Sequence, residues 1–166
     1  GMGNACLEVS LAPYNQPTRF GLEETTFLIA TNPGQTPQPL NKIASGGELS
    51  RISLAIQVAT LGTSAVGTII FDEVDVGIGG GVAQTVGALL RTLSAQAQVL
   101  CVTHLGQVAA QGHNHFKVTK DINATAIEPL SASGRVEEIA RMLSGIEITE
   151  KSLAHAREMM MTAQSR

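Results

Sequence analysis

The first forty residues alternate apolar and polar positions in the manner of β-strands. Residues 5–11 place three aliphatic side chains on one side and polar ones on the other, which is typical of a half-buried strand. Residues 25–31 are rich in β-branched side chains and predict a second strand that pairs with the first. Residues 13–21 and 32–39 predict loops, the second because it holds three prolines and a glycine. An antiparallel hairpin followed by a loop is therefore expected.

From Ser45 onward the apolar spacing changes to that of helices and buried strands. Apolar residues at helical spacing follow Ser45 and fill two faces, so we expect a helix that is buried on most sides. Residues 67–72 and 98–103 are short continuous apolar runs, the pattern of buried parallel strands. Residues 82–93 between them predict a helix. The alternation of strand and helix over residues 67–111 predicts a parallel sheet with helices packed on it.

The last third of the chain predicts a second hairpin and two helices. Residues 115–120 and 124–130 alternate like paired edge strands. Residues 136–143 and 149–161 have helical apolar spacing. The predicted fold class is therefore α/β, with a mainly parallel sheet, flanking helices and antiparallel strands at its edges.

The length of 166 residues fits one domain. We divide it into a hairpin and loop over residues 1–40, a core over residues 41–112, and an edge hairpin with C-terminal helices over residues 113–166. Charged residues make up 15% and hydrophobic residues 43% of the chain, which excludes intrinsic disorder. A net charge of −3 and only 3% aromatic residues argue against a basic or base-stacking nucleic-acid module.

The two cysteines indicate a reducing compartment. Cys6 and Cys101 lie far apart in the sequence and form no metal-binding pair, so a disulfide framework is not expected and the cytoplasm is the default location. No apolar run approaches the ~20 residues that a membrane span needs, so no membrane partner is expected.

The segment Ser45-Gly46-Gly47-Glu48 is the first candidate for binding chemistry. Its Ser-x-x-Glu spacing is a capping box, which by itself predicts only the start of a helix. The two glycines would also let a ligand approach the backbone closely. Because a helix N-terminus attracts anions, the segment could instead grip a phosphate. Both interpretations remain open on these four residues.

Two acids, Asp72 and Glu73, follow the apolar run of residues 67–71. Ligands of open α/β sheets bind at the carboxyl ends of the strands. Asp72 could hold Mg²⁺ through water, and Glu73 could polarise an attacking water as a general base. The alternative is a strand that simply ends in two solvated acids.

His104 ends the next predicted strand. Its imidazole could donate a hydrogen bond to a phosphate oxygen, although a lone histidine at a strand end is more often structural. The order and spacing of the three segments strengthen the functional interpretation of each.

Together these segments resemble the second half of an ABC-type ATPase head, with its signature motif, Walker B motif and switch histidine. The sequence is similar to the RecN family of SMC-like DNA-repair ATPases over nearly the whole chain, from about Asn4 to Met161. Four stretches carry the similarity most specifically: KIASGGELSR, IIFDEVDVGIGGGVAQ, VLCVTHLGQVAAQGHNHFKVTK and ARMLSGIEITEKSLAHAREMM.

The resemblance implies a role for each candidate. Residues 45–48 would be the signature that contacts the γ-phosphate of ATP held by the other protomer. Asp72 would be the Walker B acid near Mg²⁺, Glu73 the catalytic base and His104 the switch histidine. Residues 75–80 would be the loop that crosses the dimer interface.

This sequence departs from the broader pattern at two places. The usual aspartate of the interface loop falls at Gly79, so Asp75 does not simply inherit its role. A P-loop needs a lysine directly after glycine, and none of the four lysines follows one. The resemblance places that element in an N-terminal lobe, separated by a long coiled coil, so this chain should hold half of each site.

The resemblance therefore implies an ATP- and Mg²⁺-dependent ATPase in DNA double-strand-break repair and recombination, in the bacterial cytoplasm with the nucleoid. Its partners would be the N-terminal Walker A lobe, a second protomer and DNA, and this chain alone should be inactive. The alternatives are a non-catalytic lobe that docks DNA or the partner lobe, and the head of another SMC-like or ABC ATPase.

Overall fold

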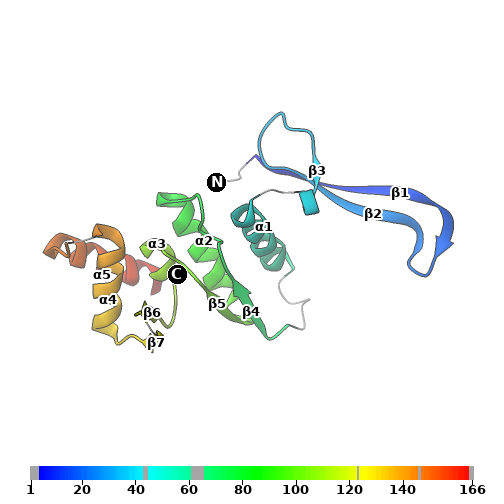
Figure 1. The fold of residues 1–166 in the computed structure, drawn as a ribbon. Helices are drawn as coiled ribbons and strands as arrows, with labels where there is room; N and C mark the ends of the chain where they lie inside the picture. The colour runs from blue at the N-terminus through cyan, green and yellow to red at the C-terminus, as the bar shows by residue number, and fades with distance from the viewer. Residues whose placement is uncertain (1–3, 43–44, 61–65, 123, 146, 165–166) are drawn as a thin grey trace.

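The computed structural model describes most of the chain, as a series of strands and helices with a long N-terminal hairpin that projects from them (Figure 1). The described residues are 4–42, 45–60, 66–122, 124–145 and 147–164.

The N-terminal hairpin is a long arm that projects from the rest of the molecule (Figure 1). Strand β1 (Cys6–Thr18) pairs antiparallel with β2 (Gly21–Ala30), and β3 (Gln38–Pro39) adds a short third strand. The predicted hairpin is confirmed. The loop predicted over residues 13–21 is wrong, because β1 continues through Pro13 as an outer strand, where proline is tolerated.

The apolar row of β1 has less cover than its pattern predicted. Leu7, Val9 and Leu11 share one face, as expected, but each of the three is exposed. The expectation that this strand is half-buried is therefore wrong for the described residues. Its alternation is nevertheless the pattern of a strand with one covered face.

The central part of the chain holds a two-stranded parallel sheet and the main hydrophobic core. Strands β4 (Thr68–Phe71) and β5 (Gln98–Cys101) pair in parallel, with Phe71 opposite Cys101. Three helices accompany them: α1 (Gly46–Ala59), α2 (Gly80–Leu93) and the short α3 (Gly106–Ala109). The buried side chains of this core are Leu54, Phe71, Val74, Ala83, Val86, Leu90, Leu93 and Val108.

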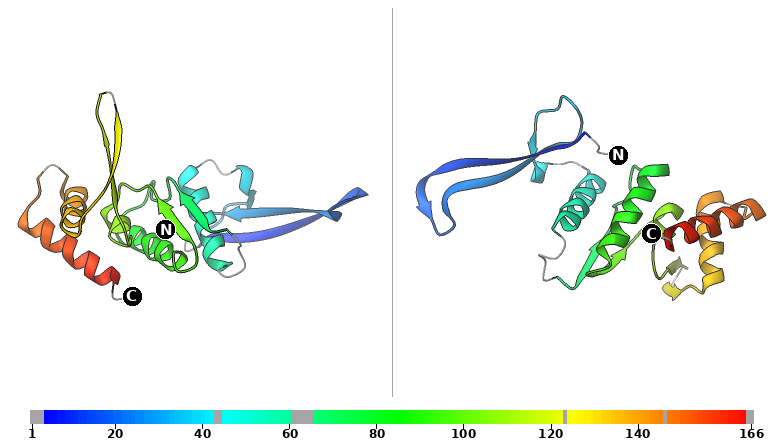
Figure 2. Two further views of the ribbon diagram at one scale, coloured as in Figure 1. Left: turned by 90° about the horizontal axis from the view of Figure 1, so that it is seen from below. Right: turned by 180° about the vertical axis from the view of Figure 1, so that it is seen from behind.

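A second, smaller core joins the C-terminal helices to α3. Helix α4 (Ala132–Ser144) packs against α5 (Glu150–Gln164), and the residues buried between these elements are Ala109, Ala110, Ile139, Ala140 and Ala156. The hairpin of β6 (Phe116–Lys120) and β7 (Thr125–Pro129) projects beside them (left view of Figure 2).

The mixed α/β class is confirmed, with one difference in arrangement. The antiparallel strands form two sheets of their own, and the parallel sheet consists of β4 and β5. Their outer face is open: Ile70 is 68% exposed, and Leu100 and Val102 are exposed beside it. The prediction of fully buried strands is therefore wrong for the described residues. The prediction that α1 is buried on most sides is also wrong there, because Leu49 and Ile56 are exposed.

Candidate nucleotide site

Helix α1 begins at a serine cap, as the sequence predicted. Ser45 has extended backbone geometry, and its Oγ accepts a hydrogen bond from the backbone N–H of Glu48 at 3.4 Å. This bond satisfies one of the amides that a helix leaves free at its first turn. The cap fixes the direction in which residues 45–48 enter the helix.

Hydrogen bonds fasten the next turn of α1 to the loop that follows β4. The Ser50 hydroxyl donates to the carbonyl of Asp72 at 2.8 Å. The Arg51 guanidinium donates to the carbonyl of Val76 at 2.8 Å and to that of Val74 at 3.4 Å. These bonds join residues that lie 22 to 25 positions apart in the sequence. The signature segment and the acidic loop are therefore held together as one unit.

The two glycines of the signature lie directly against this loop. A Cβ at Gly46 would collide with the Glu73 carboxylate. A Cβ at Gly47 would lie 3.0 Å from the carbonyl oxygen of Val76 and 3.1 Å from that of Glu73. The sequence suggested that these glycines make room for a ligand. In the structure they make room for the chain's own acidic loop.

Asp72 and Glu73 lie at the carboxyl end of β4, and both are exposed. The Asp72 carboxylate accepts a hydrogen bond from the Glu73 N–H at 2.9 Å. Glu73 has a φ of +57°, and among the described residues it is the only one other than glycine with positive φ. Such a conformation costs on the order of 1–3 kcal/mol and is common at functional sites.

A third acid of this loop, Asp75, was expected only to begin the loop that crosses the dimer interface, with no chemical role of its own. Its side chain is 2% exposed, and its Oδ2 accepts hydrogen bonds from the Thr103 hydroxyl and from the His104 N–H, the latter at 3.0 Å. The same oxygen lies 3.3 Å from His104 Nδ1. The one sequence signal that could have identified Asp75 is an acid set between the valines of a Val-Asp-Val run.

The carboxyl ends of β4 and β5 bring the predicted residues to one edge. Phe71 and Cys101 are paired, so Asp72, Glu73 and His104 follow from neighbouring strands. Burial, and then the charges of Asp75 and Asp72, raise the pKa of the Cys101 thiol to about 12. This cysteine therefore stays protonated and is no nucleophile.

The acids fit a magnesium ion whose other ligands are phosphate oxygens and water. The described residues contain no group of three or more His, Cys, Asp or Glu side chains that could cage a metal. Mg²⁺ in phosphoryl-transfer sites needs only one or two carboxylates, because waters and phosphate oxygens complete its shell. An exposed Asp72 at a strand end meets that requirement.

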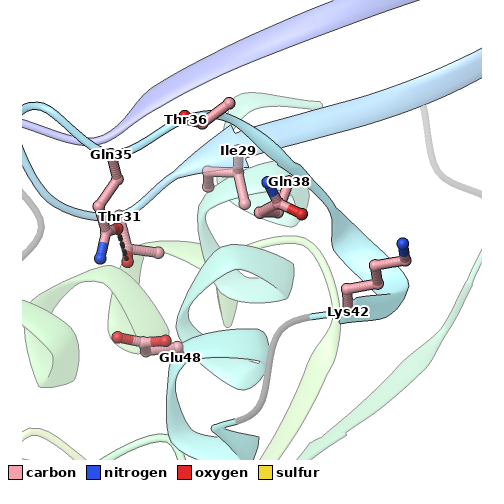
Figure 3. A pocket seen from close by; sticks show the side chains of 7 residues that line it. All are labelled: Ile29, Thr31, Gln35, Thr36, Gln38, Lys42 and Glu48. Atoms are coloured by element: carbon pink, nitrogen blue, oxygen red, sulfur yellow. Dashed lines mark hydrogen bonds between the residues drawn. The ribbon is translucent and has the colours of Figure 1, made fainter.

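A shallow, mainly polar hollow of about 350 Å³ lies beside the first turn of α1, between that turn and the loop after β2 (Figure 3). Glu48 borders it, and the Thr31 hydroxyl donates to the Gln35 side chain across its rim at 3.2 Å. Its lining residues are Ile29, Thr31, Gln35, Thr36, Gln38, Lys42 and Glu48. Of the predicted site residues, only Glu48 is among them.

No helix among the described residues has the length and apolar character needed to cross a membrane.

Comparison with solved structures shows the fold of an SMC ATPase head. One SMC ATPase, from a study of ATP-driven dimerization and DNA-stimulated activation, matches with a TM-score of 0.55 and 15% identity, over 87% of this chain and 85% of that one. The Smc head of Pyrococcus yayanosii matches with a TM-score of 0.64 and 16% identity, over 86% of this chain and 27% of that one. At these identities the likeness concerns the fold alone.

Comparison by sequence finds DNA repair proteins named RecN. No family model matches the chain. The DNA repair protein RecN of Xylella fastidiosa is 55% identical over 99% of this chain and 30% of its own length. The RecN proteins of Haemophilus influenzae and Bacillus subtilis are 57% and 43% identical, over 84% and 89% of this chain and 26% of their own lengths. The chain thus spans less than a third of these relatives.

These comparisons confirm the resemblance that the motifs indicated. The fold is that of a lobe of an SMC-type ATPase head. Within that class, the chain matches the C-terminal part of RecN over nearly all of its own length.

Proposed function

We propose that this chain is the C-terminal lobe of a RecN-like ATPase head that acts in ATP-dependent DNA double-strand-break repair and recombination. One observation carries the proposal: Asp72, Glu73 and His104 meet at one sheet edge, and hydrogen bonds fasten the capped start of α1 to the same loop. The similarity to RecN over nearly the whole chain supports the same conclusion.

Each residue of this edge has a chemical role in the proposal. Glu73 accepts a hydrogen bond from the attacking water and polarises it as a general base. Residues 45–48 and His104 donate hydrogen bonds to the γ-phosphate, the first set across a dimer. Asp72 would hold Mg²⁺ through water, and such an ion would supply positive charge against the phosphate.

The chain supplies half of each nucleotide site in this proposal, and an N-terminal Walker A lobe supplies the rest. None of the four lysines follows a glycine, so the sequence has no P-loop. The open apolar face around Ile70, Leu100 and Val102 is the kind of surface that marks a protein interface. In this proposal two heads bind ATP between them, and the intact protein binds DNA in the bacterial cytoplasm.

Nucleotide binding and hydrolysis test this function. We expect calorimetry with ATP and Mg²⁺ to give no binding to this chain alone, and binding with hydrolysis after the N-terminal lobe of its parent protein is added. Tight binding by the chain alone would contradict the half-site. A mixture without ATPase activity would favour the non-catalytic docking lobe.

A substitution at Glu73 tests the base directly. In the intact protein, Glu73→Gln should retain ATP binding and lose hydrolysis by roughly 100-fold or more, because the amide cannot take up a proton. Glu128→Gln, at an exposed carboxylate on β7, is the matched control and should hydrolyse ATP normally. Normal turnover in Glu73→Gln would rule out this residue as the base.

A further inference from the structure

We propose that Asp75 is a positioning residue that holds His104 with Nδ1 protonated and Nε2 directed to the ligand. The catalytic consequence rests on the proposed ATPase function. The contact itself, and the ring form that it selects, can be tested without that function.

The carboxylate of Asp75 is buried and depends on nearby donors. Asp75 is 2% exposed, and a buried carboxylate needs donors that replace the water it has lost. Within the described residues its hydrogen-bond donors come from the turn after β5: the hydroxyl of Thr103 and the N–H of His104, with the ring Nδ1 of His104 lying 3.3 Å from the same oxygen. No lysine or arginine pairs with it among those residues, so this turn alone satisfies its charge.

The contact with Asp75 determines which nitrogen of the His104 ring carries the proton. An ionised carboxylate only accepts hydrogen bonds, so the nitrogen beside it must carry a proton. That nitrogen is Nδ1, 3.3 Å from Asp75 Oδ2. Nε2 is then the atom left for a ligand, on a side chain that is 66% exposed. A buried aspartate that selects the tautomer and orientation of a histidine is a recurring device in catalytic sites.

Asp75 lies on the same loop as the proposed base, Glu73. The N–H of Val76 donates to the carbonyl of Glu73 at 3.2 Å, which closes a turn around Asp75. Arg51 holds the carbonyl of Val76 at 2.8 Å. The turn that orients Glu73 is therefore the turn that anchors His104. Asp75 thus couples the base from the end of β4 to the phosphate sensor from the end of β5.

The tautomer of His104 tests the contact in this chain without nucleotide. Two-bond proton–nitrogen NMR correlations distinguish the two neutral forms of the ring, and the spectrum of His104→Gln identifies the signals of His104. We expect the Nδ1–H form in the unmodified chain. Observation of the Nε2–H form there would overturn the proposal, and this readout depends on no Asp75 variant.

Two variants sharpen the test. Asp75→Ala should shift His104 toward the Nε2–H form, because Nδ1 loses its acceptor. Asp121→Ala, at an exposed aspartate, should leave the tautomer unchanged. Should Asp75→Ala fail to fold, the isosteric Asp75→Asn serves instead, since its amide can donate to Nδ1. An unchanged tautomer in a folded Asp75 variant would also overturn the proposal.

A double-mutant cycle in the intact protein tests the consequence. Asp75→Asn should lower ATP hydrolysis by about 10- to 100-fold, the effect usual for a residue behind a functional ligand. In His104→Gln the same change should have little further effect, because Asp75 acts through the ring. Fully additive losses would overturn the coupling. Unchanged hydrolysis in His104→Gln would instead refute the proposed role of His104 and leave the tautomer result standing.

Discussion

The acidic edge and the N-terminal arm are built in different ways. At the edge, side chains bond to partners far along the chain, such as Ser50 to Asp72 across 22 residues and Thr103 to Asp75 across 28. In the arm, β1 and β2 are joined by their backbone ladder, and the hydrogen bonds of its one turn, at Thr18, stay within three residues. The edge is therefore fixed by side-chain contacts between distant segments, whereas the described part of the arm is held mainly by strand pairing.

The difference shows which parts of the chain find their packing and hydrogen-bond partners within the described residues. At the edge, Ser50, Thr103 and the Nη1 of Arg51 donate to acceptors, and the buried carboxylate of Asp75 is satisfied, whereas the buried Nε of Arg51 has no partner among the described residues. The arm and the outer face of β4 and β5 carry apolar side chains that the described residues leave open, such as Leu11 and Ile70. The polar contacts of the site are made within this chain, whereas its apolar faces remain exposed. This combination fits a lobe that supplies catalytic groups and whose apolar faces pack against another lobe.

The largest effect that we predict is at the core beneath the edge. Leu54 on α1 is 1% exposed and packs among Phe71, Val74 and Leu90. Leu54→Ala should lower the free energy of unfolding by about 2–5 kcal/mol, because it removes buried methyl groups and leaves a cavity. Urea denaturation followed by circular dichroism measures it. A loss below about 1 kcal/mol would show that the central core is as loosely packed as the arm.

The hairpin of β6 and β7 lies between the edge and the arm in how firmly it is held, because an ion pair joins it to α4. Lys117 on β6 lies 2.7 Å from the carboxylate of Glu138 on α4, which also binds Arg141. The hydrogen bond from Arg141, chiefly, and that from Lys117 outweigh the effect of burial and lower the pKa of Glu138 to about 2. The stabilisation is therefore present above the ordinary glutamate pKa and is lost as the pH falls through about 2.

Glu138→Gln should lower the free energy of unfolding at pH 7 by about 1.5–3 kcal/mol, the usual contribution of hydrogen bonds to a charged group. The difference from the unmodified chain should shrink between pH 4.5 and about 2, as Glu138 itself becomes protonated. Glu137→Gln, at the exposed neighbouring position, is the control. A difference that does not depend on pH would mean that Glu138 contributes through its shape and not through its charge.

The two glycines of the signature give a smaller and more specific test of the edge. At Gly47, an added methyl group meets backbone carbonyls of the acidic loop, which cannot move alone. Overpacking should outweigh the gain in helix propensity, so Gly47→Ala should destabilise the chain by about 1–2 kcal/mol. At Gly46 it meets only the mobile end of Glu73, so Gly46→Ala should be neutral or slightly stabilising. Equal effects would show that α1 and the loop are not fastened as described.

Local and periodic patterns predicted the parts of the site that depend on nearby residues. The capping spacing identified Ser45 as the start of α1, and the ends of two apolar runs placed Asp72, Glu73 and His104 at one edge. Their roles in ATP hydrolysis remain predictions. The flanking valines could have suggested that Asp75 is buried, but not which groups donate to it, because its donors come from a turn 28 residues away in the chain.

The prediction of burial failed for a different reason. Apolar runs such as residues 67–72 predict that a strand is buried, but they do not identify the segment or chain that packs against it. The described residues cover one face of β4 and β5 and leave Ile70 and Leu100 open. The loop predicted at Pro13 was wrong for a related reason, since proline is typical of turns and is also accepted in an outer strand.

The smallest effect that we predict is in the arm, where Leu11 lies opposite Thr25 and is 56% exposed. In this chain alone, Leu11→Ala should change the free energy of unfolding by no more than about 0.5 kcal/mol, as for most surface positions. When the N-terminal lobe of the parent protein is present, the same change should cost about 1.5–3 kcal/mol if that lobe covers the row. Glu8→Ala, on the opposite face of β1, should cost little in both cases. A large cost of Leu11→Ala in the chain alone would mean that the arm is already packed, and the contrast with the acidic edge would be lost.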